Sequence, residues 1–209
     1  MPKGSEALNR ARRDEIVSAC ASLYETMGFQ DITIGDIADR TSFTRTSIYN
    51  YFQTKEEIFL ALFQREHEAW TADLEAILRE KDPPSAGELA DAIARTLEKR
   101  SRMLKLESMD LYNIEGRSRM EALVSFKKAY ARAREAVARC LERSFPAMSD
   151  GDIRDFLYAF FPFLFGVYPY VAPTEKQRRA MDLAGVGYPR LSIYEITRSF
   201  LVKTLAAYQ

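Results

Sequence analysis

Positive charge without acidic residues is concentrated in one short segment near the N-terminus. From residue 40 to residue 55 there are three basic residues, Arg40, Arg45 and Lys55, and no aspartate or glutamate. Residues 3–13 add Lys3, Arg10, Arg12 and Arg13 against a single acidic residue, Glu6. Local clusters of lysine and arginine are what binds a phosphate backbone. The two segments therefore predict contact with nucleic acid.

The side chains between Arg45 and Phe52 sort onto different faces if the segment is helical. Ile48 and Phe52 are one turn apart and are expected to point into a core. Two further pairs at the same spacing lie on other faces: Arg45 with Tyr49, and Thr46 with Asn50. These side chains offer hydrogen-bond donors, acceptors and an aromatic edge, which is what contact with base edges and phosphates needs.

Lys55 is unusual for its place at the start of a predicted helix. A positive charge in the first turn opposes the helix macrodipole and gives no local benefit. Beside a phosphate, however, the lysine and the helix N-terminus both become favourable. We therefore predict that Lys55 contacts the DNA backbone.

The elements that would position these residues are short helices with recognisable caps. Residues 34–41 and 44–52 predict two helices joined by a tight turn, the dimensions of a helix-turn-helix motif. Thr33 with Asp36, and Thr54 with Glu57, have the spacing of capping boxes. Thr54 would open a long fourth helix that carries Phe59, Phe63 and Trp70 on one stripe.

Helical periodicity continues to the end of the chain, without a convincing alternating strand. Ser149 with Asp152 and Ser192 with Glu195 predict the starts of the last two long helices. We expect an all-α protein of about nine helices. Residues 1–54 would form a three-helix DNA-binding domain, and residues 55–209 a helical domain for effector binding and dimerisation, with the fourth helix crossing the boundary.

Residues 10–60 resemble the DNA-binding domain of the TetR family. The resemblance rests on four motifs: Thr33-Ile34-Gly35-Asp36-Ile37-Ala38, Thr44, Ile48-Tyr49-Asn50-Tyr51-Phe52, and Lys55-Glu56-Glu57-Ile58. It implies a homodimer with an N-terminal DNA-binding domain and a C-terminal domain that dimerises and binds an effector. One departure is Ser42, where the family usually has glycine in the turn.

The family resemblance also assigns roles to individual positions. It implies phosphate contacts by Thr33, Thr44, Tyr51 and Lys55, and groove-facing positions for Arg45, Thr46, Ser47, Tyr49 and Asn50. The alternative is structural: Tyr49 and Tyr51 would be packing aromatics, and Thr33 and Thr44 helix caps. Capping and DNA contact are compatible for both threonines.

Aromatic residues in the second half exceed what a plain helical core needs. Most would fill the core and a dimer interface, and the rest would wall a pocket for a flat or apolar effector. The predicted pocket residues are His67, Trp70, Tyr112, Phe126, Tyr130 and Phe160. His67 is the single histidine, and its other interpretation is a structural core residue.

The last two long helices carry more apolar surface than a chain end needs. A two-fold pairing of two copies would cover that surface in both at once. The predicted interface residues are Phe156, Phe161, Leu164, Ile196, Phe200 and Leu201. A dimer also doubles the DNA site, since one short helix reads few base pairs.

Composition excludes several other classes. Lys+Arg and Asp+Glu are both 30, so the chain is not a polycation that coats nucleic acid. Two cysteines without a CxxC pair and a single histidine predict no disulfide framework, metal site, cofactor or catalytic centre, and fit the cytoplasm. The apolar run 156–171 is short for a membrane span and contains Pro162, Gly166 and Pro169, so we interpret it as a buried helix.

Together these features predict a transcriptional regulator rather than an enzyme. We expect it to bind a pseudo-palindromic double-stranded DNA operator as a homodimer, and to act as a repressor that a small apolar or aromatic effector releases. Two alternatives would use the same DNA-binding domain: a regulator independent of any ligand, and an activator. A helical bundle that only binds proteins is disfavoured by the basic, acid-free segment 40–55.

Overall fold

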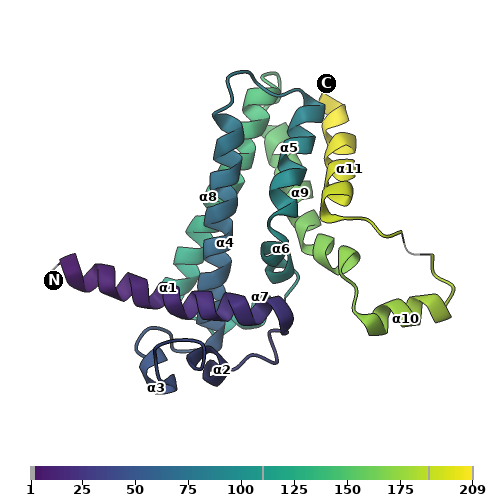
Figure 1. Ribbon diagram of the computed structural model, residues 1–209. Helices are drawn as coiled ribbons and strands as arrows, with labels where there is room; N and C mark the ends of the chain where they lie inside the picture. Colours follow the sequence, from purple (N-terminus) through teal and green to yellow (C-terminus); the bar gives the residue numbers. More distant parts are fainter. Residues whose placement is uncertain (1–2, 110, 188, 209) are drawn as a thin grey trace. The chain divides into compact units, whose positions relative to one another are not determined.

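The structure is a computed structural model that describes residues 3–109, 111–187 and 189–208. Within these ranges the chain forms eleven α-helices, one 3₁₀ helix and no strand, so the all-α prediction is confirmed (Figure 1). The sequence predicted about nine helices, because the short helices α7 and α10 bury few apolar residues and leave little periodic signal.

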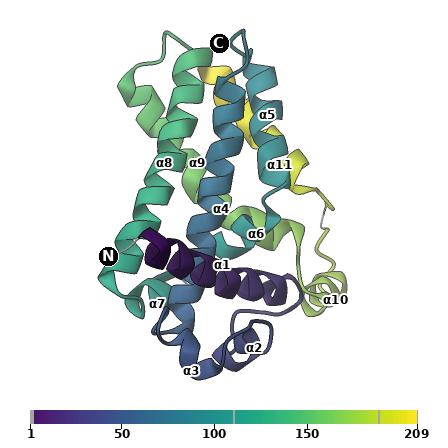
Figure 2. The same ribbon diagram turned by 60° about the vertical axis from the view of Figure 1, so that its left-hand side comes forward.

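The first compact unit comprises residues 1–65 and 110–129. It contains α1 (Lys3–Thr26), α2 (Ile34–Ala38), α3 (Arg45–Ile48), α7 (Leu111–Gly116) and the first parts of α4 (Lys55–Leu78) and α8 (Met120–Ser144). Both views show α2 and α3 together beside α1 (Figures 1 and 2). Its core includes Ile16, Tyr24, Ile37, Ile48 and Phe59.

The second compact unit comprises residues 66–109 and 130–209. It contains α5 (Ala86–Glu98), α6 (Ser101–Glu107), α9 (Asp150–Val171), α10 (Glu175–Leu183), α11 (Ile193–Leu205), η1 (Ala206–Tyr208) and the remaining parts of α4 and α8. In this unit α11 packs beside α5 and α9, whereas α10 lies apart from α5 and α11 in both views (Figures 1 and 2). The helices α4 and α8 each belong to both units, and the functional boundary between residues 54 and 55 stays a prediction.

Helix caps explain most of the observed helix starts. Capping boxes are formed by Thr33 with Asp36, Ser149 with Asp152 and Ser192 with Glu195, as their spacing predicts. At α4 only half of the predicted box forms. The Thr54 hydroxyl accepts from the N–H of Glu57 at 3.2 Å, but the Glu57 carboxylate accepts from the Gln53 N–H and from Arg119 instead of Thr54.

The long apolar helix α9 contains Pro162 and Pro169 and still runs from Asp150 to Val171. Phe156, Phe160 and Leu164 lie on its buried face. No single helix in the described part of the chain has the length and apolar composition to cross a membrane. One pair of helices meets these criteria only when taken together, α9 and α10, which are bent by 79° relative to each other.

Candidate nucleic-acid interface

The helix-turn-helix presents a polar, solvent-exposed surface around α3. Arg45, Thr46, Tyr49 and Asn50 are exposed, and Ile48 beneath them is fully buried. The helix itself is shorter than the predicted 44–52, because after Ile48 the chain continues as turns, with the N–H of Tyr51 donating to the carbonyl of Ile48 at 2.9 Å. The predicted sorting of faces therefore holds over this short helix and the turns that follow it.

Thr44 and Ser47 stabilise the start of α3. The Thr44 hydroxyl oxygen accepts from the Ser47 N–H at 3.2 Å, and the two hydroxyl oxygens are 2.9 Å apart. Thr44 is exposed and Ser47 half-buried. Thr44 is thus a helix cap, as the structural alternative proposed, and its exposed position also leaves it accessible to a phosphate.

Thr33 has the same double character at the start of α2. Its hydroxyl donates to the Asp36 carboxylate at 2.6 Å and accepts from the Asp36 N–H. Hydrogen bonds from the Thr33 side chain and backbone lower the pKa of Asp36. The capping role is therefore present, and the contact of Thr33 with phosphate stays a prediction.

The turn between α2 and α3 does not need the glycine that the family usually has at position 42. No non-glycine residue in the described ranges has a positive φ, so Ser42 fits the turn without backbone strain. Its N–H donates to the Glu15 carboxylate of α1 at 2.7 Å, which lowers the pKa of Glu15. The departure from the family pattern leaves the motif intact.

Two arginines of α1 hold the segment that follows α3. The Arg12 guanidinium donates to the Tyr51 hydroxyl at 2.9 Å, and that of Arg13 donates to the Tyr51 carbonyl at 2.7 Å. The Arg13 guanidinium also lies 4.2 Å from the centre of the Phe52 ring. Burial and the charge of Arg119 lower the pKa of Arg13. The sequence predicted these arginines as phosphate-binding charge, but not their contacts within the protein.

Lys55 is likewise engaged within the protein. Its ammonium donates to the carbonyl of Phe29 at 2.7 Å and lies 4.3 Å from the centre of the Phe29 ring. The side chain is half-buried. An ammonium has three donors, so one bond to Phe29 leaves donors for a phosphate. The predicted phosphate contact of Lys55 is therefore compatible with this geometry.

The most extensive ionic contact of the first unit joins Glu57 to Arg119. The Arg119 guanidinium donates to both Glu57 oxygens, at 2.6 and 2.8 Å, and the N–H groups of Gln53 and Arg119 donate to the same carboxylate. Burial works to raise the pKa of Glu57, but these hydrogen bonds and the Arg119 charge lower it from 4.5 to about 2. Next to it, the Thr54 hydroxyl donates to the Arg117 carbonyl and Arg117 pairs with Glu56.

Four of the six predicted effector residues come together in the second unit. His67 and Tyr130 have ring centres 5.6 Å apart, and Trp70 and Phe160 are 6.5 Å apart. Phe161, which was predicted as an interface residue, lies between them, 6.0 Å from Trp70 and 5.3 Å from Tyr130. The Trp70 indole N–H donates to the Thr96 hydroxyl at 3.0 Å.

A buried carboxylate that sequence analysis missed belongs to the same cluster. Glu107 is 1% exposed, and its Oε1 lies 3.3 Å from Nε2 of the fully buried His67. Burial, followed by the charge of Glu107, raises the pKa of Tyr130. No local motif marks Glu107, because only the packing of α6 beside α4 and α8 brings it to His67 and Tyr130.

The other two predicted effector residues lie in the first unit. Phe126 is buried, with its ring stacked on Phe63 at 4.8 Å. Tyr112 is 93% exposed on α7. Tyr112 therefore forms no part of a buried wall in this structure. Its apolar character suggested burial, but the helix that carries it, α7, is short and presents this side chain to solvent.

The predicted interface residues divide between the core and the surface. Phe156, Phe161, Leu164 and Leu201 are buried inside the single chain, whereas Ile196 and Phe200 are partly exposed. The buried four have almost no surface to offer a second copy, which corrects their assignment to an interface. Periodicity identifies an apolar stripe but does not show which apolar face the chain itself covers. The exposed apolar side chains on these helices are Tyr158, Phe165, Tyr170 and Val202.

The all-helical fold and the capped, exposed α3 define a helix-turn-helix DNA-binding regulator. Two family descriptions match the chain: "Bacterial regulatory proteins, tetR family" over residues 16–62, and "Tetracyclin repressor-like, C-terminal domain" over residues 64–206. The chain belongs to the TetR family of transcriptional regulators.

Individual relatives agree with this assignment. The uncharacterized HTH-type transcriptional regulator YdgC of Bacillus subtilis is 34% identical over 68 residues, which cover 32% of this chain and 35% of YdgC. The chain spans about a third of the length of the curated relatives it matches.

Solved structures extend the similarity in fold over nearly the whole chain. A TetR/AcrR-family regulator from Thermobifida fusca is 21% identical, with a TM-score of 0.64 and coverage of 95% of this chain and 99% of that one. FadR of Bacillus subtilis in complex with stearoyl-CoA is 15% identical, with a TM-score of 0.61 and coverage of 93% and 98%.

Proposed function

We propose that the chain is a homodimeric repressor that binds a pseudo-palindromic operator and is released from it by a small apolar or aromatic effector. The observation that carries the DNA-binding part is the exposed surface of Arg45, Thr46, Tyr49 and Asn50, in a segment without an acidic residue. In a dimer, two such surfaces would enter successive major grooves, about one helical turn or a multiple of it apart. DNA binding also requires the compartment that holds DNA, so the cytoplasm is part of the proposal.

A gel-shift titration with the DNA upstream of the protein's own gene tests operator binding. We expect a shift that unrelated DNA of the same length does not compete away at equal concentration. Asn50→Ala should weaken the specific shift, whereas Arg154→Ala, at an exposed arginine near the start of α9, should leave it unchanged. Equal affinity for both DNAs would contradict a sequence-specific regulator.

The second unit contains the groups that could recognise an effector. Glu107, His67 and the Tyr130 ring place polar groups among the aromatic rings of Trp70, Phe160 and Phe161. An apolar environment with a few polar groups is typical of small-molecule sites. The complex of FadR with stearoyl-CoA supports the idea that a chain of this fold holds a small ligand.

Binding of the effector would lower the affinity for the operator by changing the distance between the two DNA-binding domains of the dimer. We expect a coupling on the order of 1–3 kcal/mol. A panel of aromatic and aliphatic compounds, added to the gel shift, tests release. Glu107→Gln should weaken release by the active compound while operator binding persists, and Glu98→Gln, at an exposed position on α5, is the control. A regulator that no compound releases would favour the ligand-independent alternative.

Dimerisation would use the exposed faces of α9 and α11. Phe165 and Val202 are 39% and 40% exposed, and partly exposed Phe200 lies on α11 with Val202. Covering these side chains in both copies removes apolar surface from water. Phe165→Glu and Val202→Glu should each lower the mass measured by light scattering towards that of a monomer. Tyr112→Glu, at an exposed position of the first unit, should leave the dimer intact; an unchanged mass for all three would place the interface elsewhere.

A further inference from the structure

The helix α10 is well formed although none of its residues is buried. At its start the Thr174 hydroxyl accepts from the Gln177 N–H, and the Gln177 side-chain oxygen accepts from the Thr174 N–H. At its end Gly185 has a φ of 67°, and the N–H of Val186 donates to the carbonyl of Met181 at 3.0 Å. Both ends are thus closed by local hydrogen bonds. These local hydrogen bonds stabilise the helix itself, although it is not part of the core.

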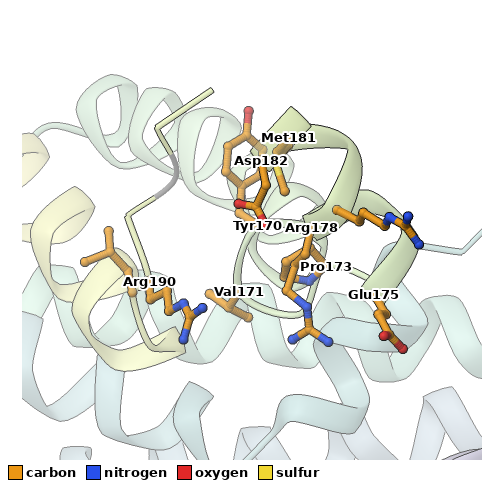
Figure 3. A pocket seen from close by; sticks show the side chains of 10 residues that line it. Tyr170, Val171, Pro173, Glu175, Arg178, Met181, Asp182 and Arg190 are labelled. Atoms are coloured by element: carbon orange, nitrogen blue, oxygen red, sulfur yellow. The ribbon is translucent and has the colours of Figure 1, made fainter. Parts of the chain in front are cut away.

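Two adjoining hollows lie between α10, the end of α9 and the loop that leads to α11. Their volumes are about 610 and 700 Å³, within the range of small-molecule sites. They share five lining residues: Tyr170, Val171, Pro173, Met181 and Leu191. Figure 3 shows the first hollow, with Arg190 on the loop and Arg178 on α10. The two hollows therefore adjoin each other along these residues, and their remaining linings differ in chemistry.

The larger hollow is an apolar groove. Besides the shared residues it is lined by proline, alanine, valine and isoleucine side chains: Pro169, Ala180, Val186, Pro189 and Ile196. The side-chain oxygen of Gln177, which also lines it, is already occupied by the cap at Thr174. The groove therefore favours an apolar chain.

The smaller hollow is rich in arginine. Arg178, Arg179 and Arg190 line it together with two carboxylates, Glu175 and Asp182. Within the described part of the chain none of the three guanidiniums has an ion-pair partner, and the two carboxylates have none either. Three arginines against two acids leave a positive balance beside the groove. Guanidiniums that are not already paired bind carboxylate or phosphate through paired hydrogen bonds.

We propose that this site binds a small amphipathic anion, with an alkyl chain in the apolar groove and an anionic head at Arg178 and Arg190. The charge of the arginine end distinguishes such a ligand from a neutral or cationic apolar molecule. The site is separate from the aromatic cluster around His67 and Trp70, and the proposal does not depend on repression or on the operator.

Isothermal titration of the full-length protein with monomeric dodecanoate tests the site. Dodecyltrimethylammonium has the same chain with the opposite charge, and butanoate has the same head with a short chain. We expect dodecanoate to bind at least tenfold more tightly than either, since each lacks one half of the recognition. Equal affinity for dodecanoate and dodecyltrimethylammonium would overturn the proposal.

Two variants locate the binding, and one controls for charge. The double variant Arg178→Gln/Arg190→Gln should remove the preference for dodecanoate over dodecyltrimethylammonium, and Met181→Asp should reduce dodecanoate affinity at least tenfold. Neither should disturb folding, because α10 contributes no buried residue and Arg190 is exposed on the loop that follows; circular dichroism checks this. Lys176→Gln removes a charge from the same helix outside the lining and should change nothing. Dodecanoate affinity that survives both site variants would show that the anion binds elsewhere.

Two other occupants of the groove are outcomes of the same set of measurements. If dodecanoate gives no heat and Met181→Asp lowers the mass by light scattering, a second copy of the chain covers the groove. If the protein sediments with phosphatidylglycerol vesicles but does not bind monomeric dodecanoate, the groove meets a lipid surface. Either result overturns the proposal of a small ligand, while a gel shift on the operator would leave the proposed function unaffected.

Discussion

The charged residues Arg13, Glu57 and Arg119 of the first unit and those of α10 and the loop after it, here called the α10 arm (residues 175–191), are of the same types but have opposite surroundings. In the first unit Arg13, Glu57 and Arg119 are held by hydrogen bonds to side chains and backbone. On the arm the described residues provide no ion-pair partner for Arg178 or Arg190. A charge with several internal partners stabilises the fold, whereas a charge without one leaves its hydrogen-bonding capacity for a ligand.

The number of internal partners therefore distinguishes charged residues that stabilise the fold from charged residues that are available to a ligand. Composition alone does not make this distinction. Both regions contain arginine and glutamate in similar proportion, and a count of charges treats them alike. The basic segment 40–55 is intermediate, because Arg45 on α3 is exposed while Lys55 at the start of α4 donates to the carbonyl of Phe29. Removing charges from the three places should therefore affect folding, DNA binding and ligand binding separately.

Glu57 should give the largest effect on stability. Its pKa of about 2 lies below the ordinary 4.5, so the carboxylate contributes stability that is fully present above pH 4.5. The difference in pKa corresponds to at most about 3 kcal/mol, because Arg119 is partly exposed and water screens the pair. Glu57→Gln should lower the free energy of unfolding by about that amount at pH 7, measured by urea denaturation.

The pH dependence makes the test of Glu57 specific. As pH falls from 4.5 to about 2, Glu57 is protonated in the unfolded chain before it is protonated in the folded protein. The gap between wild type and Glu57→Gln should therefore close over this range. Glu68→Gln removes a carboxylate from an exposed pair with Arg132 and should cost less than about 1 kcal/mol. A gap that persists at low pH would mean that packing, and not charge, accounts for the loss.

Arg45 should affect DNA binding without affecting stability. Its side chain is exposed at the start of α3. Arg45→Ala should weaken operator binding by about 1–3 kcal/mol and relax the preference at one base position. Gel shifts on operators substituted at each position would show this, with urea denaturation as the control for folding. A uniform loss on every sequence would instead assign Arg45 to the phosphate backbone.

Lys55 should show both kinds of effect. Loss of its hydrogen bond to the Phe29 carbonyl should lower the free energy of unfolding by about 1 kcal/mol in Lys55→Ala. If the same ammonium also contacts a phosphate, the slope of log affinity against log salt should fall by about one. An unchanged salt slope together with a lower free energy of unfolding would mean that Lys55 is a structural residue of the DNA-binding domain, like Arg13.

The sequence predicted what depends on neighbours along the chain. The caps at Thr33, Thr44, Ser149 and Ser192 follow from side chains three residues apart, so local spacing is sufficient. The inward direction of Ile48 and Phe52 follows from helical periodicity for the same reason.

Contacts between distant segments were beyond this kind of reasoning. Arg119 reaches Glu57 across 62 residues, and Glu107 reaches His67 across 40, with no motif that links either pair. Periodicity identified the apolar positions of α9. Which of these positions are buried within the chain depends on the packing of α4, α6 and α11 against that helix. The aromatic cluster of the second unit was therefore predicted in part. Of the predicted interface residues, Phe156, Phe161 and Leu164 lie on the buried side of α9, whereas Ile196 and Phe200 on α11 are partly exposed.

The arm should give the smallest effect on stability. Arg178 and Arg179 lie on a helix without buried residues, and the described residues offer them no ion pair, so Arg178→Gln/Arg179→Gln removes no internal contact. We expect the free energy of unfolding to change by less than about 0.5 kcal/mol. Arg100 of the same unit is the matched control, because it donates to Asp73 from both Nε and Nη2, at 2.8 and 2.5 Å. Arg100→Gln should cost about 1–2 kcal/mol. Urea denaturation of both variants, without ligand, measures the difference. If the arm variant loses as much free energy of unfolding as Arg100→Gln, the arginines of the arm have a structural role, as Arg13 and Arg119 do.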